Sequence, residues 1–130
     1  MELQSKKVTV QKSAEELCDY LADVKNFEGL MPENIRKFEL RGDDSFVFAL
    51  KGMPDIALQL EEVQKPNKIV LGAVNDNFPF KLIGNITELT DSSSEIQLDF
   101  NGQFNAMMSM MIKSPISKFL STLSDNLSTI

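Results

Sequence analysis

The sequence contains no histidine, no tryptophan and a single cysteine, Cys18. Without histidine, the chain lacks the commonest general base near neutral pH and the commonest metal ligand in proteins. One cysteine cannot form an intramolecular disulfide or a thiolate cluster for a structural metal. These absences disfavour catalytic triads and zinc sites, and we expect neither a metal nor another cofactor.

Long apolar runs and an excess of positive charge are missing as well. No stretch approaches the roughly 18 apolar residues of a transmembrane helix, and residues 1–7 lack the apolar core of a signal peptide. The net charge of −6 opposes binding to a phosphate backbone. The sequence therefore predicts a cytoplasmic protein with no integral membrane segment and no nucleic-acid partner.

The chain has the material for one folded domain. It has 130 residues, of which 42% are hydrophobic, including nine phenylalanines and seven methionines. A chain of this length can bury roughly 65 to 70% of its unfolded surface in one core. We therefore predict a single domain over residues 1–130.

The N-terminal region changes from a strand pattern to a helix pattern. Apolar and polar residues alternate over 2–11, which predicts a strand. Ser13 and Glu16 have the spacing of a capping box, which predicts a helix start. We expect Gly29 to end this helix in the left-handed conformation, and Pro32 to begin a second short helix.

The middle of the chain returns to a period of two, which predicts a meander of about five strands. The strand segments are residues 38–50, 56–60, 69–73, 78–86 and 96–104, with turns expected at 52–55, 65–68, 75–77 and 91–94. Glycines at 72, 84 and 102 predict bends or bulges. The clean alternation over 96–104 predicts a sheet with one dry face and one wet face.

The tail, from Ala106 to Ile130, has apolar residues at helical spacing and predicts one long helix. Its start holds four of the seven methionines, which we expect to lie against the sheet and close over a cavity. Pro115 predicts a kink, or a restart of the helix with Ser114 as cap.

This order of elements, with the segments Ser13 to Asp23, Asn26-Phe27 and Leu30-Met31-Pro32, resembles the START-like (SRPBCC, Bet v 1-like) superfamily over essentially the whole chain. The resemblance implies an α+β helix-grip fold. In that fold a curved antiparallel β-sheet wraps around a long C-terminal α-helix, two short helices follow the first strand, and the space between sheet and helix often holds a hydrophobic ligand. The methionine-rich segment is similar to small stand-alone bacterial members.

The candidate binding residues are mostly apolar, since ligand pockets are lined mainly by apolar side chains with a few polar anchors. We expect the cavity to be lined by Phe27, Met31, Phe46, Phe48, Leu58, Leu71, Phe80, Leu98, Phe100, Met108, Met111 and Ile112. Tyr20 could supply a polar anchor. The same residue types would also fill an ordinary core.

Residues that could carry chemistry are few. Adjacent carboxylates on a strand point to opposite faces, so the pair Glu61-Glu62 is expected to be solvated charge. Cys18 lies on the apolar stripe of the first helix and is expected to be a buried hydrophobe rather than a nucleophile. We predict no catalytic residues.

The sequence therefore favours non-catalytic binding of a small hydrophobic molecule, lipid-like or polyketide-like, by a monomer or weak homodimer. One alternative is an enzyme of the polyketide cyclase or dehydratase type, which needs two or more polar groups directed into the cavity. The other is a protein-interaction module, chaperone-activator-like or self-associating, which would show an exposed apolar patch.

Overall fold

The computed structural model describes residues 1–33, 35–51, 53, 55–74 and 79–130. Residues 52 and 54 of the predicted turn at 52–55, the whole predicted turn at 75–77, and Phe78 lie outside these residues. The elements, in chain order, are β1 (Glu2–Gln4), β2 (Val8–Val10), α1 (Ala14–Ala22), the 3-10 helix η1 (Val24–Leu30), β3 (Lys37–Leu40), β4 (Ser45–Ala49), β5 (Ile56–Gln64), β6 (Lys68–Ala73), β7 (Phe80–Thr90), β8 (Ser93–Gly102) and α2 (Ala106–Leu127).

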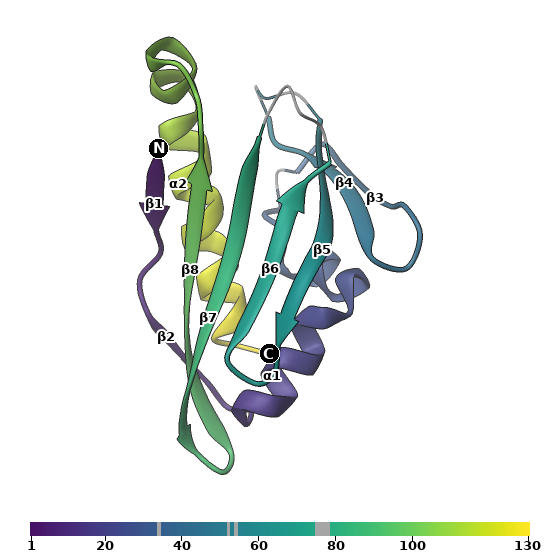
Figure 1. Ribbon diagram of the computed structural model, residues 1–130, viewed down its shortest axis with the longest axis vertical. Helices are drawn as coiled ribbons and strands as arrows, with labels where there is room; N and C mark the ends of the chain where they lie inside the picture. Colours follow the sequence, from purple (N-terminus) through teal and green to yellow (C-terminus); the bar gives the residue numbers. More distant parts are fainter. Residues whose placement is uncertain (34, 52, 54, 75–78) are drawn as a thin grey trace.

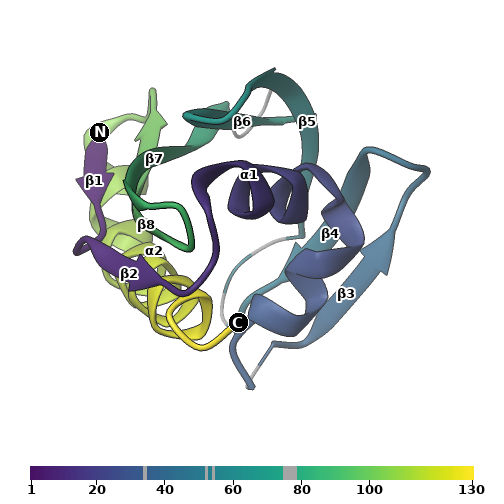
Figure 2. The same cartoon turned by 90° about the horizontal axis from the view of Figure 1, so that it is seen from below.

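The strands form one antiparallel sheet in the order β1-β8-β7-β6-β5-β4-β3, and β2 continues the pairing of the N-terminal segment with β8. The sheet curls around the helices (Figures 1 and 2). Helix α1 packs on β5 to β8, while α2 packs on β1, β2, β8 and η1. The predicted helix-grip architecture, with a curved sheet around a long C-terminal helix, is confirmed.

The hydrophobic core lies between the concave face of the sheet and the helices. Strand β8 shows how the sequence specifies it, because Ile96, Leu98 and Phe100 are each at most 5% exposed while Gln97 and Asp99 on the opposite face are partly exposed. Complete burial of one such apolar side chain stabilises the fold by about 1.5–3 kcal/mol. The predicted dry and wet faces are confirmed.

The predicted first strand is two strands, separated at Ser5. Ser5 is 8% exposed, and its hydroxyl accepts a hydrogen bond from the Leu98 amide at 2.9 Å. Its backbone amide donates to the Leu98 carbonyl at 2.8 Å. These bonds satisfy buried polar groups at the interruption, so the segment stays attached to β8.

The capping box that starts α1 is confirmed, but the helix end was predicted wrongly. The Ser13 hydroxyl accepts from the Glu16 amide at 3.1 Å, and the Glu16 carboxylate accepts from the Ser13 amide at 3.2 Å. Helix α1 ends at Ala22, and η1 then continues through Gly29 with no left-handed residue. The second helix therefore precedes Pro32 instead of following it.

The segment after Pro32 does not form the predicted second short helix to Lys37. A single turn forms, in which the Ile35 amide donates to the Pro32 carbonyl at 3.2 Å. The Arg36 amide then donates to the Ala49 carbonyl at 2.9 Å. Pairing with the edge of β4 therefore takes the chain into β3 before a helix can extend.

In the described part of the chain, six strands lie between η1 and α2, where about five were predicted. The additional one arises because the segment 38–50 folds as a hairpin of β3 and β4. Gly42 lies in its turn with φ of 87°, a conformation that glycine adopts without steric cost. The bulges of the sheet lie between Leu60 and Glu62 and between Glu88 and Thr90.

None of these register shifts is at Gly72, Gly84 or Gly102, so the bulge alternative does not apply to them, and the bend alternative stays a prediction. Two of these glycines allow side chains to approach closely. A Cβ on Gly72 would lie 2.0 Å from a carboxylate oxygen of Glu61. A Cβ on Gly102 would lie 2.3 Å from the ring of Phe104. The absence of a Cβ thus leaves room for the Glu61 side chain at Gly72 and for the Phe104 ring at Gly102.

Helix α2 runs unbroken through Pro115 and is capped by Asn105, whose side chain accepts from the Met108 amide at 2.8 Å. The predicted restart at Ser114 is therefore wrong. The start of α2 projects beyond the end of the sheet (Figure 1). In the described part of the chain, no helix is both long and apolar enough to span a bilayer.

Candidate functional site: a cleft beside the C-terminal helix

The space between the sheet and α2, where the sequence predicts a ligand cavity, is almost completely filled by side chains. A cavity of about 10 Å³ remains. Its described lining residues are Leu21, Phe27, Leu30, Ile69, Leu71, Leu82, Gly84, Leu98, Leu123 and Leu127. This volume is close to the minimum for one water molecule, and the apolar lining offers a water few partners. An organic ligand could not enter without displacing core side chains.

The predicted lining residues have several locations. Phe27, Leu71 and Leu98 border the small internal cavity. The other buried members, each at most 8% exposed, belong to the core: Met31, Phe46, Phe48, Leu58, Phe80, Phe100 and Ile112. Tyr20 and Met108 are partly exposed and pack against the core.

Met111 departs from the expectation, since its side chain is 68% exposed. Met107 and Met110 are 75% and 82% exposed. Three of the four methionines at the start of α2 are therefore exposed, and only Met108 packs against the core. This end of the helix extends past the sheet, so no strand is available to cover its outward side (Figure 1).

A larger space, an open cleft of about 540 Å³, lies on the side of α2 that faces the end of β4. Its described lining residues are Pro32, Leu50, Lys51, Ser114, Pro115, Lys118, Phe119, Ser121 and Thr122. They come from the segment after η1, the segment after β4, and two turns of α2. None of the twelve predicted cavity residues is among them.

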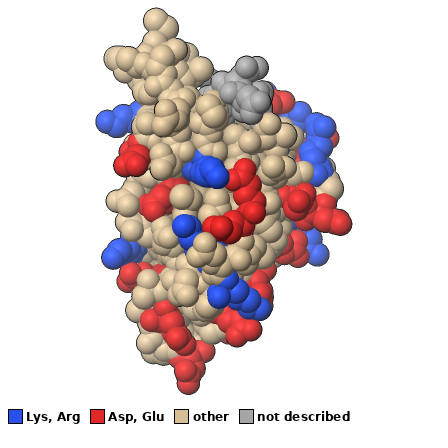
Figure 3. Space-filling view, in the orientation of Figure 1, with Lys and Arg blue, Asp and Glu red and all other residues tan. Residues whose placement is uncertain are grey.

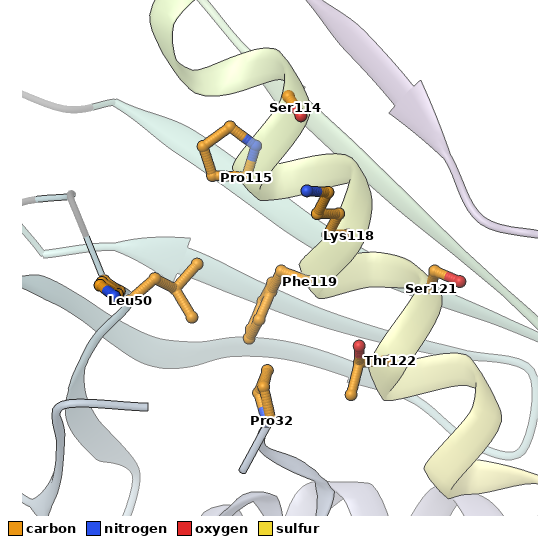
Figure 4. A pocket seen from close by; sticks show the side chains of 9 residues that line it. Pro32, Leu50, Ser114, Pro115, Lys118, Phe119, Ser121 and Thr122 are labelled. Carbon is orange, nitrogen blue, oxygen red and sulfur yellow. The ribbon is translucent and has the colours of Figure 1, made fainter. Parts of the chain in front are cut away.

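The apolar floor of the cleft is formed by Leu50 and Phe119, with Pro32 opposite them (Figure 4). Leu50 is 7% exposed and Phe119 is 5% exposed, so the backs of both side chains are packed into the core. The ring of Phe119 stacks on Phe48, with centroids 4.9 Å apart and an interplanar angle of 11°. This stack holds the floor in place and separates the cleft from the core.

The polar groups of the cleft are two lysines and three hydroxyls. Neither Lys51 nor Lys118 forms an ion pair with any residue that the structure describes. The hydroxyls of Ser114, Ser121 and Thr122 likewise make no hydrogen bond within the described residues. By contrast, Ser124 on the same helix donates to the Leu120 carbonyl at 2.9 Å. The polar groups of the cleft are thus available to a ligand.

The helix face that borders the cleft continues into the exposed methionines. Residues four apart lie above one another on a helix, so Pro115, Met111 and Met107 form one stripe. Lys118 follows Pro115 on this stripe after three residues, and Thr122 follows Lys118 after four. The stripe therefore runs from the cleft towards the overhanging end of α2, where its side chains are flexible thioethers.

The described lining offers little for acid-base chemistry, since it includes no carboxylate, phenol or guanidinium group. No group of three or more metal-ligating side chains occurs among the described residues. Cys18 is fully buried, and burial raises the pKa of its thiol, which disfavours the nucleophilic thiolate. The internal cavity is lined, in its described part, only by apolar residues and Gly84, so the two or more polar groups that the enzyme alternative requires are not found there.

Comparison with solved structures identifies the architecture. Norcoclaurine synthase from Thalictrum flavum, in complex with dopamine and hydroxybenzaldehyde, superposes with a TM-score of 0.76 at 13% identity, over 99% of this chain and 84% of that one. A START superfamily protein from Mycobacterium smegmatis gives a TM-score of 0.67 at 14% identity, over 98% and 94% of the two chains. The chain has a START-like, Bet v 1-like fold.

A Thermobifida fusca protein has the same START-like fold, with a TM-score of 0.71 at 14% identity over 98% of this chain and 90% of that one. No protein-family model and no curated protein sequence matches the chain. At these identities the START-like resemblance concerns the fold, so the site must be argued from the residues of this chain.

The cleft has only weak signals in the sequence. Pro32, Leu50 and Phe119 are far apart along the chain, and each looks like a turn or core residue by itself. Lys118 resembles an ordinary solvent-exposed lysine on a helix. The stripe of Met107, Met111, Pro115 and Lys118 at helical spacing was the one readable sign, because it mixes apolar and basic residues on a face that the core does not need.

Proposed function

We propose that this protein binds a small, largely apolar molecule in the cleft between α2 and the end of β4, without chemically changing it. The observation that carries the proposal is the cleft itself: about 540 Å³, with a fixed apolar floor and polar groups that have no partner among the described residues. This volume lies within the roughly 300–1,000 Å³ range of ligand pockets.

The fold supports the proposal in a general way. The structure of norcoclaurine synthase in complex with dopamine and hydroxybenzaldehyde is an example of this architecture with small aromatic molecules bound. In this chain side chains fill the central space between the sheet and α2. The proposed site is therefore the outer cleft, which Phe119 separates from the core. Lipid-like and polyketide-like molecules both remain within the proposed ligand class, since Leu50 and Phe119 would contact either an acyl chain or a ring system.

Mass spectrometry of the purified protein tests this function. Protein isolated from its native host should release a stoichiometric small molecule on gentle denaturation, which a matched blank lacks. It should also brighten a hydrophobic dye, and the released molecule should displace that dye. A protein that is empty and leaves the dye dark would contradict the proposal.

A second candidate function is self-association, and the exposed methionines favour it. Residues 101–112 contain no charged side chain, and this end of the molecule shows neither blue nor red at the upper left of Figure 3. Two copies that each carry a net charge of −6 repel one another, so an uncharged end is where they can approach most closely. We propose a second copy of this chain as the partner of this surface.

A further inference from the structure

The charge of the cleft differs from that of the molecule as a whole. The chain has 19 acidic and 13 basic residues. The described lining of the cleft contains two lysines and no carboxylate. Six other lysines are within ion-pairing distance of an acidic side chain: Lys6, Lys7, Lys25, Lys37, Lys65 and Lys81. Lys51 and Lys118 have no such partner among the described residues, as is also true of Lys12, Lys68 and Lys113, but only Lys51 and Lys118 lie together in one cleft.

The arrangement of the polar and apolar groups matches one kind of molecule. Leu50 and Phe119 provide an apolar surface, with Lys118 beside it (Figure 4), and Lys51 also lines the cleft. The hydroxyls of Ser114 and Thr122, which lie eight residues apart along α2, can each donate a hydrogen bond to a different part of a bound ligand. A neutral apolar ligand would leave these polar groups unused, and a cationic one would be repelled by both lysines.

We propose that the cleft selects an anionic amphiphile whose carboxylate or phosphate pairs with Lys51 and Lys118 while its apolar body covers Leu50 and Phe119. This inference rests on the proposed function and names its ligand class. The protein's net negative charge repels anions elsewhere, so the two lysines also determine where on the molecule such a ligand is held.

Matched ten-carbon probes test the inference. Decanoate and decyl phosphate carry an anionic group, decanol has the same chain without charge, and acetate and inorganic phosphate have the charge without the chain. In dye displacement, decanoate and decyl phosphate should bind more tightly than decanol, and the two small anions should not compete. Both probes should lose their advantage at about 1 M NaCl, where the screening length falls to roughly 3 Å.

Lysine variants locate the effect. Lys51→Ala and Lys118→Ala should each weaken decanoate binding about two- to fivefold, as expected for exposed charge pairs, and should weaken decanol binding by a smaller factor, since decanol loses only contact with the lysine stem. Lys113→Ala is the matched control, because Lys113 is exposed, lies on the same helix, and is not among the described lining residues. It should leave both affinities unchanged.

The outcomes separate this inference from the proposed function. If decanol binds as tightly as decanoate, the head-group inference is wrong and apolar binding in the cleft stands. If Lys113→Ala weakens decanoate as much as Lys118→Ala does, general electrostatics explains the preference and the inference is again wrong. If no ten-carbon probe binds at all, both the inference and the proposed function are contradicted.

Discussion

A substitution at Gly84 can test whether a ligand binds inside the filled core or in the outer cleft. This glycine borders the internal cavity, and a Cβ added there would lie 3.5 Å from the Ile96 Cδ1 atom, an ordinary contact distance. Its φ is not in the positive range, so alanine fits the backbone. An added methyl would therefore occupy part of the cavity without a clash.

We expect Gly84→Ala to raise the free energy of unfolding by about 0.4–1 kcal/mol, because alanine has less conformational freedom to lose on folding. Urea denaturation measures this change. The affinity for decanoate should not change, because the ligand lies in the cleft on the far side of Phe119. Gly29→Ala is the control for the effect of replacing glycine with alanine as such, because a Cβ at Gly29 would have no atom within 4 Å and Gly29 is not among the described residues that line the cavity. If Gly84→Ala alone reduced affinity, the ligand would have to enter the internal cavity.

Substitutions at the start of helix α2 can test self-association separately from ligand binding in the cleft. Replacing Met107, Met110 and Met111 with glutamine keeps the side-chain length and removes the apolar surface. All three are at least 68% exposed, so the free energy of unfolding should change little.

If these methionines associate with a second copy, sedimentation equilibrium should show a weak, concentration-dependent dimer for the wild type and a monomer for the triple variant. The association should be weak, because three side chains fall far short of the roughly 1,200–2,000 Å² that stable interfaces bury. A wild-type protein that stays monomeric at every concentration would eliminate this second candidate and leave ligand binding unaffected.

Elements with a strong local signal were predicted correctly from the sequence. The capping box at Ser13 specifies the start of α1 through two hydrogen bonds within four residues. The alternation in β8 specifies which face is buried, because the period of a strand is two. These features depend on residues close together in the chain, which a pattern can identify.

Elements decided by distant partners were predicted less well. Pro32 is typical of the first turn of a helix. The segment after it nevertheless pairs with Ala49 at the edge of β4 and continues as strand β3. The methionine pattern predicts a helix correctly, but it could not show that the helix extends beyond the sheet. The cleft also depends on residues that are distant in the sequence, because Pro32, Leu50 and Phe119 come together only in the folded protein.

The whole molecule combines a filled core with a surface site. The aromatic stack that runs from Phe38 through Phe46 and Phe48 to Phe119 links β3 and β4 to α2, with successive ring centroids 5.3, 6.0 and 4.9 Å apart. Aromatic pairs of this kind contribute about 0.5–1.5 kcal/mol each beyond their buried area. The last ring of this stack is also the floor of the cleft, so the packing that stabilises the fold shapes the proposed site.

A titration of the ¹⁵N-labelled protein with decanoate, followed by two-dimensional NMR, shows where on the molecule this ligand binds. We predict saturable shifts of the backbone amides at Leu50, Lys51, Lys118, Phe119 and Thr122, with little change around Leu71 and Leu98. Shifts centred on Leu71 and Leu98 would instead place the ligand inside the core, and no saturable shift at any concentration would contradict ligand binding in the cleft.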